Sequence, residues 1–154
     1  MISNVTGEFK EFDGTVESSK EDFSDAKIYF EADVNSVTTG NEQRDGHLKS
    51  DDFFNAAVYP KLKFVSTEIS KNDEHQYKVN GELTIRDRTL PITVDVRYNG
   101  KDAMGGNTSA GFEITGRINR KDFGLRWNAP TEAGGLVVGE ETRIDINAEL
   151  VQQA

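Results

Sequence analysis

Apolar residues recur at every second position through much of this chain, and this period constrains the fold more than any other feature. Five segments of seven residues or more show it: 26–34, 77–85, 92–98, 112–118 and 144–150. Successive side chains of a strand point to opposite faces, so each segment has one apolar and one polar face. The pattern predicts antiparallel strands that are solvated on one side.

Two further strands are less regular. Residues 62–64 alternate before Val65 disturbs the phase, and residues 5–9 alternate until Phe12 breaks the period, which indicates a bulge or bend. About seven strands at short spacing, with little helix, predict an all-β fold that is either a closed barrel or a sandwich.

The chain of 154 residues is expected to form a single domain spanning residues 1–154. Its one helix is expected within residues 41–57, because Pro60 prevents a helix from continuing. The surrounding segment, residues 38–60, carries the densest mixture of polar and aromatic groups in the protein.

Charge and composition exclude several classes of function. The formal net charge of −9 opposes non-specific binding to nucleic acid. Cysteine is absent, which excludes a disulfide framework and a thiolate nucleophile. No apolar run approaches the roughly 18 residues that a membrane-spanning helix needs. No leader segment is visible in the sequence as given, which leaves the localisation open: cytoplasmic, or periplasmic if a preceding segment has been removed.

The inward faces of the predicted strands leave two interpretations open. Gly81, Gly116, Ala32 and Ala148 lie on the apolar faces, where their small size leaves space. Either large neighbours fill that space, or the barrel contains an apolar cavity that holds one ligand. For the second case the expected wall residues are Ile28, Phe30, Val79, Leu83, Val94, Phe112 and Ile114.

Aromatic and basic residues are candidates for the ends of such a cavity. Phe53, Phe54 and Trp127 are expected to cap it. Residues 117–127 are basic within an acidic protein, and Arg120 or Arg126 is a candidate to hold a polar headgroup. The alternative, which we favour for most of these cations, is that they form internal ion pairs.

Catalytic signatures are weak. His47 has Asp45 two residues before it, which makes a small hydrolase or isomerase using this pair an alternative function. No nucleophile of the Gly-x-Ser-x-Gly type accompanies them, and the second histidine, His75, lies in a polar turn. We therefore expect no catalytic residue, no metal site and no cofactor other than a bound ligand. A third alternative is a structural or interaction barrel with a packed interior.

Several motifs together resemble the YceI-like family of lipocalin-like, polyisoprenoid-binding bacterial barrels. The resemblance covers nearly the whole chain in family order, and its most specific motifs are Arg44-Asp45-Gly46-His47-Leu48-Lys49-Ser50 and Asn119-Arg120-Lys121-Asp122-Phe123-Gly124. It implies an eight-stranded antiparallel barrel with a short helical insertion and an apolar tunnel. It also implies non-covalent binding of a long isoprenoid lipid or quinone, without catalysis.

The chain departs from this family at its start. Family members usually begin with another strand, which precedes the counterpart of Met1-Ile2-Ser3. Seven strands leave the barrel open with two unpaired edges, so we expect edge-to-edge pairing, as in a homodimer, near Thr6 and Ile146.

Overall fold

The computed structural model describes residues 6–104, 107–127 and 141–151. Seven antiparallel strands form one sheet in the order β2-β3-β5-β6-β7-β8-β9, and β1 and β4 form a separate two-stranded sheet. The strands are β1 (Glu8–Phe9), β2 (Phe12–Glu17), β3 (Lys27–Asp33), β4 (Val37–Thr38), β5 (Lys61–Lys71), β6 (Gln76–Ile85), β7 (Arg88–Met104), β8 (Asn107–Asn119) and β9 (Glu141–Val151). The prediction of an antiparallel, lipocalin-like barrel with about seven strands is confirmed.

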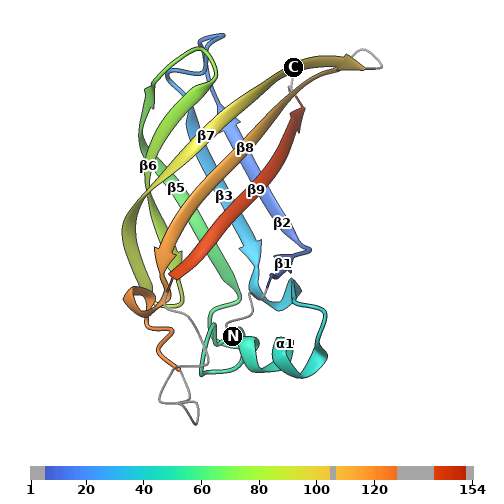
Figure 1. The fold of residues 1–154 in the computed structure, drawn as a ribbon, viewed down its shortest axis with the longest axis vertical. Helices are drawn as coiled ribbons and strands as arrows, with labels where there is room; N and C mark the ends of the chain where they lie inside the picture. The colour runs from blue at the N-terminus through green and yellow to red at the C-terminus, as the bar shows by residue number, and fades with distance from the viewer. Residues whose placement is uncertain (1–5, 105–106, 128–140, 152–154) are drawn as a thin grey trace, which may run out of the picture.

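The sheet is curled. In the view of Figure 1, β7, β8 and β9 lie in front of β2, β3 and β5, with β6 at the turn between them. The apolar faces point into the space so enclosed, where Ala32 and Val79 are fully buried. Among the described residues no ladder joins β2 to β9, so these two strands are the edges of an open barrel.

One prediction about these edges was wrong. Residues 8–9 form only the short β1, which pairs with β4, and the first strand of the main sheet is β2. Within the described residues, the free edges therefore lie along Phe12–Glu17 and along β9, which contains Ile146, and not near Thr6.

The helical insertion lies where the sequence predicted it. Helix α1 spans Glu42–Lys49, and the side chain of Asn41 caps it by accepting a hydrogen bond of 3.0 Å from the Arg44 amide. Two 3-10 helices, η1 (Val34–Ser36) and η2 (Arg120–Phe123), complete the regular structure. Figure 1 places α1 and η2 at one end of the barrel and the β2–β3 and β5–β6 turns at the other.

Glycines on the inward faces do not leave empty space. A Cβ atom on Gly81 would lie 2.4 Å from the Phe64 ring, and one on Gly116 would lie 2.9 Å from Cγ1 of Val94. Large side chains from neighbouring strands thus occupy the volume beside both glycines. At these two positions the interpretation in which neighbours fill the space is correct.

Candidate functional site

An apolar cavity lies inside the barrel, toward the end opposite α1. Its volume is about 40 Å³, which exceeds the roughly 10–15 Å³ that a cavity needs to hold one water molecule. Eleven side chains from both edges and from the middle of the sheet line it: Val16, Phe23, Ala26, Ile28, Ile69, Tyr77, Val96, Phe112, Ile114, Ala148 and Leu150. Val16 belongs to β2 and Ala148 and Leu150 to β9, so the cavity extends to the unpaired seam of the barrel.

Phe23 closes the cavity at the end that carries the β2–β3 loop. Its backbone takes a positive φ of 60°, which is uncommon for a residue with a side chain. Its ring makes edge contacts with Tyr98 and Phe112, each at 5.4 Å between ring centroids. The loop therefore inserts an aromatic ring into the barrel mouth.

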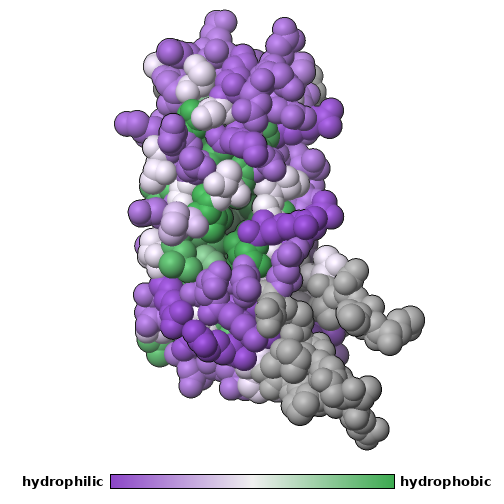
Figure 2. Space-filling model, turned by 60° about the vertical axis from the view of Figure 1, so that its left-hand side comes forward, coloured by the Kyte–Doolittle hydropathy of each residue, from purple (hydrophilic) through white to green (hydrophobic). Residues whose placement is uncertain are grey.

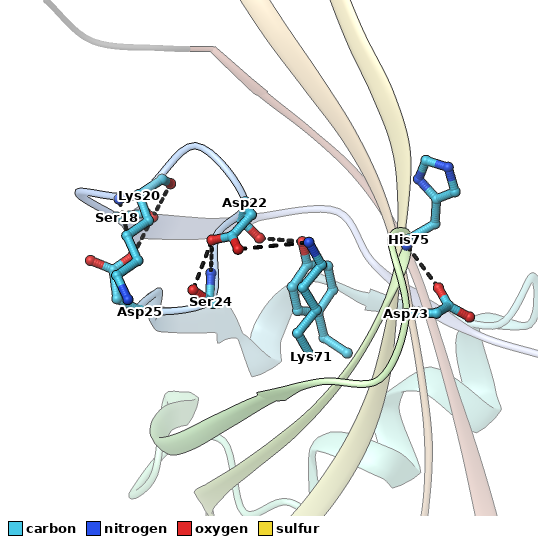
Figure 3. A network of polar contacts seen from close by, with 9 residues as sticks. Ser18, Lys20, Asp22, Ser24, Asp25, Lys71, Asp73 and His75 are labelled. Carbon is cyan, nitrogen blue, oxygen red and sulfur yellow. Dashed lines mark hydrogen bonds and ion pairs between the residues drawn. The ribbon is translucent and has the colours of Figure 1, made fainter.

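Polar contacts hold this loop in place (Figure 3). The carboxylate of Asp25 accepts hydrogen bonds from the Ser18 hydroxyl at 2.7 Å, the Ser19 amide at 3.0 Å and the Lys20 amide at 3.2 Å. The hydroxyls of Ser19 and Ser18 hold the pKa of Asp25 far below its ordinary value, so this carboxylate stays ionised.

Asp22 fastens the same loop to the barrel wall. Its carboxylate oxygen Oδ2 lies 3.7 Å from Nζ of Lys71, at the end of β5. Its backbone carbonyl accepts a hydrogen bond from the Tyr77 hydroxyl. Burial raises the pKa of Tyr77, so its hydroxyl remains protonated as the donor. The loop is thus tied to β5 and β6.

The other end of the barrel is closed by aromatic rings from α1, the segment after it and the segment after η2. Phe53 is buried and lies 5.6 Å from Trp127, while Phe54 packs against Phe9 at 5.9 Å. His47 contacts both Phe53 and Trp127, at 5.1 and 4.5 Å between ring centroids. Phe53, Phe54 and Trp127 therefore gather at one end, whereas Phe23, which was not among the expected capping residues, closes the other.

The expected wall residues are all part of the core, but they divide into two groups. Val79, Leu83, Val94 and Phe112 are buried, whereas Ile28, Phe30 and Ile114 are half-buried. Of these seven, only Ile28, Phe112 and Ile114 line the cavity. Their role as ligand contacts remains a prediction.

Eight of the eleven lining residues were not among the expected wall residues, and three of these eight also lie outside the segments with a regular two-residue period: Val16, Phe23 and Ile69. Val16 lies in a short edge strand, and Ile69 follows a register shift of β5 against β6 between Ser66 and Glu68, which changes the phase of the pattern. Phe23 is the one apolar side chain in the polar segment Glu17–Asp25. That isolated aromatic was the available signal.

The two candidate headgroup arginines differ in environment. Arg120 is 5% exposed, and its Nη1 donates to the carbonyl oxygens of Leu125 at 2.6 Å and Trp127 at 2.8 Å. Its guanidinium also lies 5.9 Å from the Phe53 ring centroid. Arg126 is exposed. Arg120 thus binds backbone carbonyls of its own chain, which favours the internal role over a headgroup role.

The pairing of His47 with Asp45 was wrong. Asp45 accepts hydrogen bonds from the Thr39 amide at 2.8 Å and the Thr39 hydroxyl at 2.5 Å, whereas Nε2 of His47 lies 2.7 Å from Oδ2 of Asp52. No group of three or more metal-ligating side chains occurs within residues 6–104, 107–127 and 141–151. In that same part of the chain, no helix has the length and apolar character needed to cross a membrane.

Apolar side chains also reach the surface. Figure 2 shows one face of the molecule on which they gather about midway along its length, with polar side chains above and below. Apolar surface is therefore accessible from the side of the barrel as well as in its interior.

The sequence matches the YceI-like domain family over residues 1–150. A relative, UPF0312 protein SAS2572 of Staphylococcus aureus (strain MSSA476), is 39% identical over 151 residues, which are 97% of this chain and 85% of that protein. The crystal structure of the Campylobacter jejuni YceI protein superposes with a TM-score of 0.88 at 28% identity, covering 100% of this chain and 88% of that one.

More distant structures share the fold. BcnA of Burkholderia cenocepacia matches with a TM-score of 0.79 at 24% identity, over 96% of this chain and 87% of that one. A polyisoprenoid binding domain from Saccharophagus degradans, implicated in plant cell wall breakdown, matches with a TM-score of 0.59 at 15% identity, over 96% of this chain and 85% of that one.

Proposed function

This chain belongs to the YceI-like family, and from that membership we propose that it binds a long-chain isoprenoid lipid or quinone non-covalently inside its open barrel. The observation that carries the proposal is the cavity lined by eleven apolar and aromatic side chains, which reaches the seam between β2 and β9. The polyisoprenoid binding domain from Saccharophagus degradans has the same fold, which supports a ligand of this class by analogy.

Burial of apolar surface supplies the driving force. Each Å² of hydrocarbon removed from water contributes about 25 cal/mol, so a prenyl chain that buries a few hundred Å² gains several kcal/mol before ordering costs. The lining offers such a chain no buried charge to desolvate.

The cavity of about 40 Å³ must widen to admit such a chain. The free-energy cost of this widening is low in an open sheet, because moving β2 away from β9 breaks no ladder hydrogen bond between them. A closed barrel would have to break backbone hydrogen bonds to make the same movement. Widening of the cavity around a bound chain therefore involves separation of the sheet edges.

The proposal is tested by organic extraction of freshly purified protein followed by mass spectrometry. We expect an isoprenoid or quinone at near-stoichiometric amount. Ile114→Lys, which places a charge in the cavity, should abolish it. Thr115→Lys is the matched control, because Thr115 points to the other face and lies opposite Asp145. Wild-type protein that carries no such lipid and takes none up from vesicles would contradict the proposal.

A second candidate function has one specific observation in its favour. The side chains of Phe64 and Val94 fill the space beside the inward glycines Gly81 and Gly116, as expected for a barrel that acts only as a structural or interaction module. The extraction experiment separates the two, since a packed module retains no lipid and its apparent stability does not change when isoprenoid is added.

A further inference from the structure

Strands β3 and β5 separate partway along the barrel wall. Their ladder runs from Asp33↔Lys61 to Tyr29↔Val65 and ends there. Beyond that point β3 continues to Lys27 beside β2, and β5 continues to Lys71 beside β6. The next contact across the divide is made by a side chain, the Ser66 hydroxyl, which accepts a hydrogen bond of 2.8 Å from the Ile28 amide.

A hollow of about 420 Å³ opens on the outer side of this gap. It is lined by residues of β2, β3, β5 and the β2–β3 loop: Thr15, Glu17, Asp25, Ala26, Lys27, Ile28, Tyr29, Val65, Ser66, Thr67, Glu68 and Ile69. Ala26, Ile28 and Ile69 also line the interior cavity. Three small or aliphatic side chains thus separate the outer hollow from the apolar interior.

The hollow is amphipathic. Ala26, Ile28, Val65 and Ile69 give it an apolar part, while Thr15, Tyr29, Ser66 and Thr67 contribute hydroxyls. Three acidic residues, Glu17, Asp25 and Glu68, also line it, with one cation, Lys27. This excess of negative charge repels phosphorylated groups. The Tyr29 hydroxyl already donates to Glu31 at 3.0 Å and the Thr67 hydroxyl to the Asn80 carbonyl oxygen at 3.2 Å, so these two can accept a hydrogen bond from a ligand hydroxyl. The Ser66 hydroxyl accepts from the Ile28 amide and can donate its own proton to a ligand carbonyl.

We propose that the gap between β3 and β5 is the side entrance through which the isoprenoid chain passes into the barrel, and that the hollow outside it holds an uncharged hydroxyl or carbonyl end of the ligand. This inference rests on the proposed function and adds a route and a headgroup class to it. The chain displaces Ile28 and Ile69, and its passage breaks no ladder hydrogen bond, because β3 and β5 are not paired there.

The β2–β3 loop borders this entrance through Asp25 and Ala26. It is held there by the contact of Asp22 with Lys71, the last residue of β5, and by the hydrogen bond from the Tyr77 hydroxyl. Release of these contacts widens the gap and withdraws Phe23 from the barrel mouth at the same time. The loop therefore couples the side entrance to the free volume inside.

The route is tested by bridging the gap in a chain that has no natural cysteine. Lys27→Cys with Thr67→Cys places thiols on the two strands at exposed positions, two residues beyond the pair Tyr29↔Val65. After cross-linking with a short bis-maleimide, uptake of fluorescent geranylgeraniol in stopped-flow should slow at least ~10-fold, equivalent to a barrier about 1.4 kcal/mol higher. Release should slow by the same factor, leaving the Kd unchanged.

The control pair is Lys78→Cys with Asp95→Cys, which are exposed direct partners in the β6–β7 ladder. Cross-linking this pair should leave uptake unchanged. If the Lys27–Thr67 bridge does not form, a bulky single maleimide on Thr67→Cys, compared with the same label on Lys78→Cys, blocks the hollow from outside.

The outcomes distinguish the entrance from the function. A bridged protein that takes up geranylgeraniol as fast as the unbridged one overturns the side entrance and leaves lipid binding intact, with the β2–β9 seam as the route. Failure of the wild-type protein to bind geranylgeraniol overturns both.

The headgroup preference has its own measurement. Wild-type protein should bind geranylgeraniol more tightly than geranylgeranyl diphosphate at low salt. Glu17→Gln with Glu68→Gln should raise diphosphate affinity about threefold or more and leave alcohol affinity unchanged. Glu82→Gln with Glu149→Gln, outside the hollow, is the control for net charge. Tighter binding of the diphosphate by wild-type protein overturns this part of the proposal.

Discussion

The ring of Phe64 occupies the space that a side chain at Gly81 would need, since a Cβ atom there would lie 2.4 Å from Cζ of the ring and 2.6 Å from the Val65 carbonyl oxygen. Gly81 lies in β6 directly opposite Ser66 of β5, two residues from Phe64. A glycine in one strand and an aromatic in the next therefore form a single packing unit.

Gly81→Ala should destabilise the protein by about 1–3 kcal/mol, because the core must shift to accept the extra methyl group. Phe64→Leu combined with Gly81→Ala should recover part of that loss, which a double-mutant cycle measured by urea unfolding will detect. Gly46→Ala is the control, because nothing lies within 4 Å of its added Cβ atom and alanine favours the helix there. A Gly81→Ala protein as stable as wild type would contradict this packing.

This pair also shows what the sequence can predict. The alternation of β6 fixes Gly81 on the inward face, because neighbouring Lys78, Asn80 and Glu82 are hydrophilic. It does not say which side chain of another strand lies over the glycine, because that depends on the register between strands. The strands and their faces followed from local pattern, while the filling of the interior depended on contacts between strands.

The residues of the candidate site also fall into those predicted from local alternation and those that depend on contacts distant in sequence. Ile28, Phe112 and Ile114 were predicted from alternation and line the cavity. Phe23 was not, because its position depends on a loop that folds back into the barrel mouth. The error in pairing His47 with Asp45 could have been recognised from the sequence, since residues two apart on a helix do not face each other. Asp52, five residues further on, reaches His47 only because α1 ends at Lys49.

Arg120 is expected to stabilise the fold and not to bind a ligand headgroup. Arg120→Met should cost roughly 2–4 kcal/mol of stability, because the carbonyls of Leu125 and Trp127 each lose a charge-assisted donor in a buried site. Arg126→Met should change stability by less than about 0.5 kcal/mol, because Arg126 is exposed. Both are measured by thermal and urea unfolding. Loss of lipid affinity in Arg126→Met at unchanged stability would instead assign Arg126 to the headgroup.

Asp25 should make the β2–β3 loop sensitive to acid. Hydrogen bonds from Ser19 and Ser18 depress its pKa in the folded state below the ordinary value of 3.8. A depressed carboxyl pKa stabilises the folded loop fully above the unfolded pKa, and the contribution is lost as the pH falls below 3.8 toward the folded value.

Hydrogen exchange of the Ser19 and Lys20 amides is the measurement for this loop. Protection should be constant from about pH 7 to pH 5 and decline below about pH 4. Asp25→Asn should show low protection throughout, while Asp13→Asn, in β2 and outside this network, should behave like wild type. Unchanged protection in Asp25→Asn would show that the carboxylate does not hold the loop.

Phe23 is expected to occupy volume that the ligand needs. Phe23→Ala removes the ring that lies between Tyr98 and Phe112 and opens the cavity toward the barrel mouth. Stability should fall by about 1–3 kcal/mol, less than for a fully buried phenylalanine, because Phe23 is only half-buried. Affinity for geranylgeraniol should rise several-fold, because the chain no longer has to displace the ring.

Phe12→Ala is the control, since Phe12 is 58% exposed and does not line the cavity. Calorimetric titration of both variants decides the role of the ring: weaker binding by Phe23→Ala alone would mean that Phe23 contacts the bound chain instead of yielding its place to it.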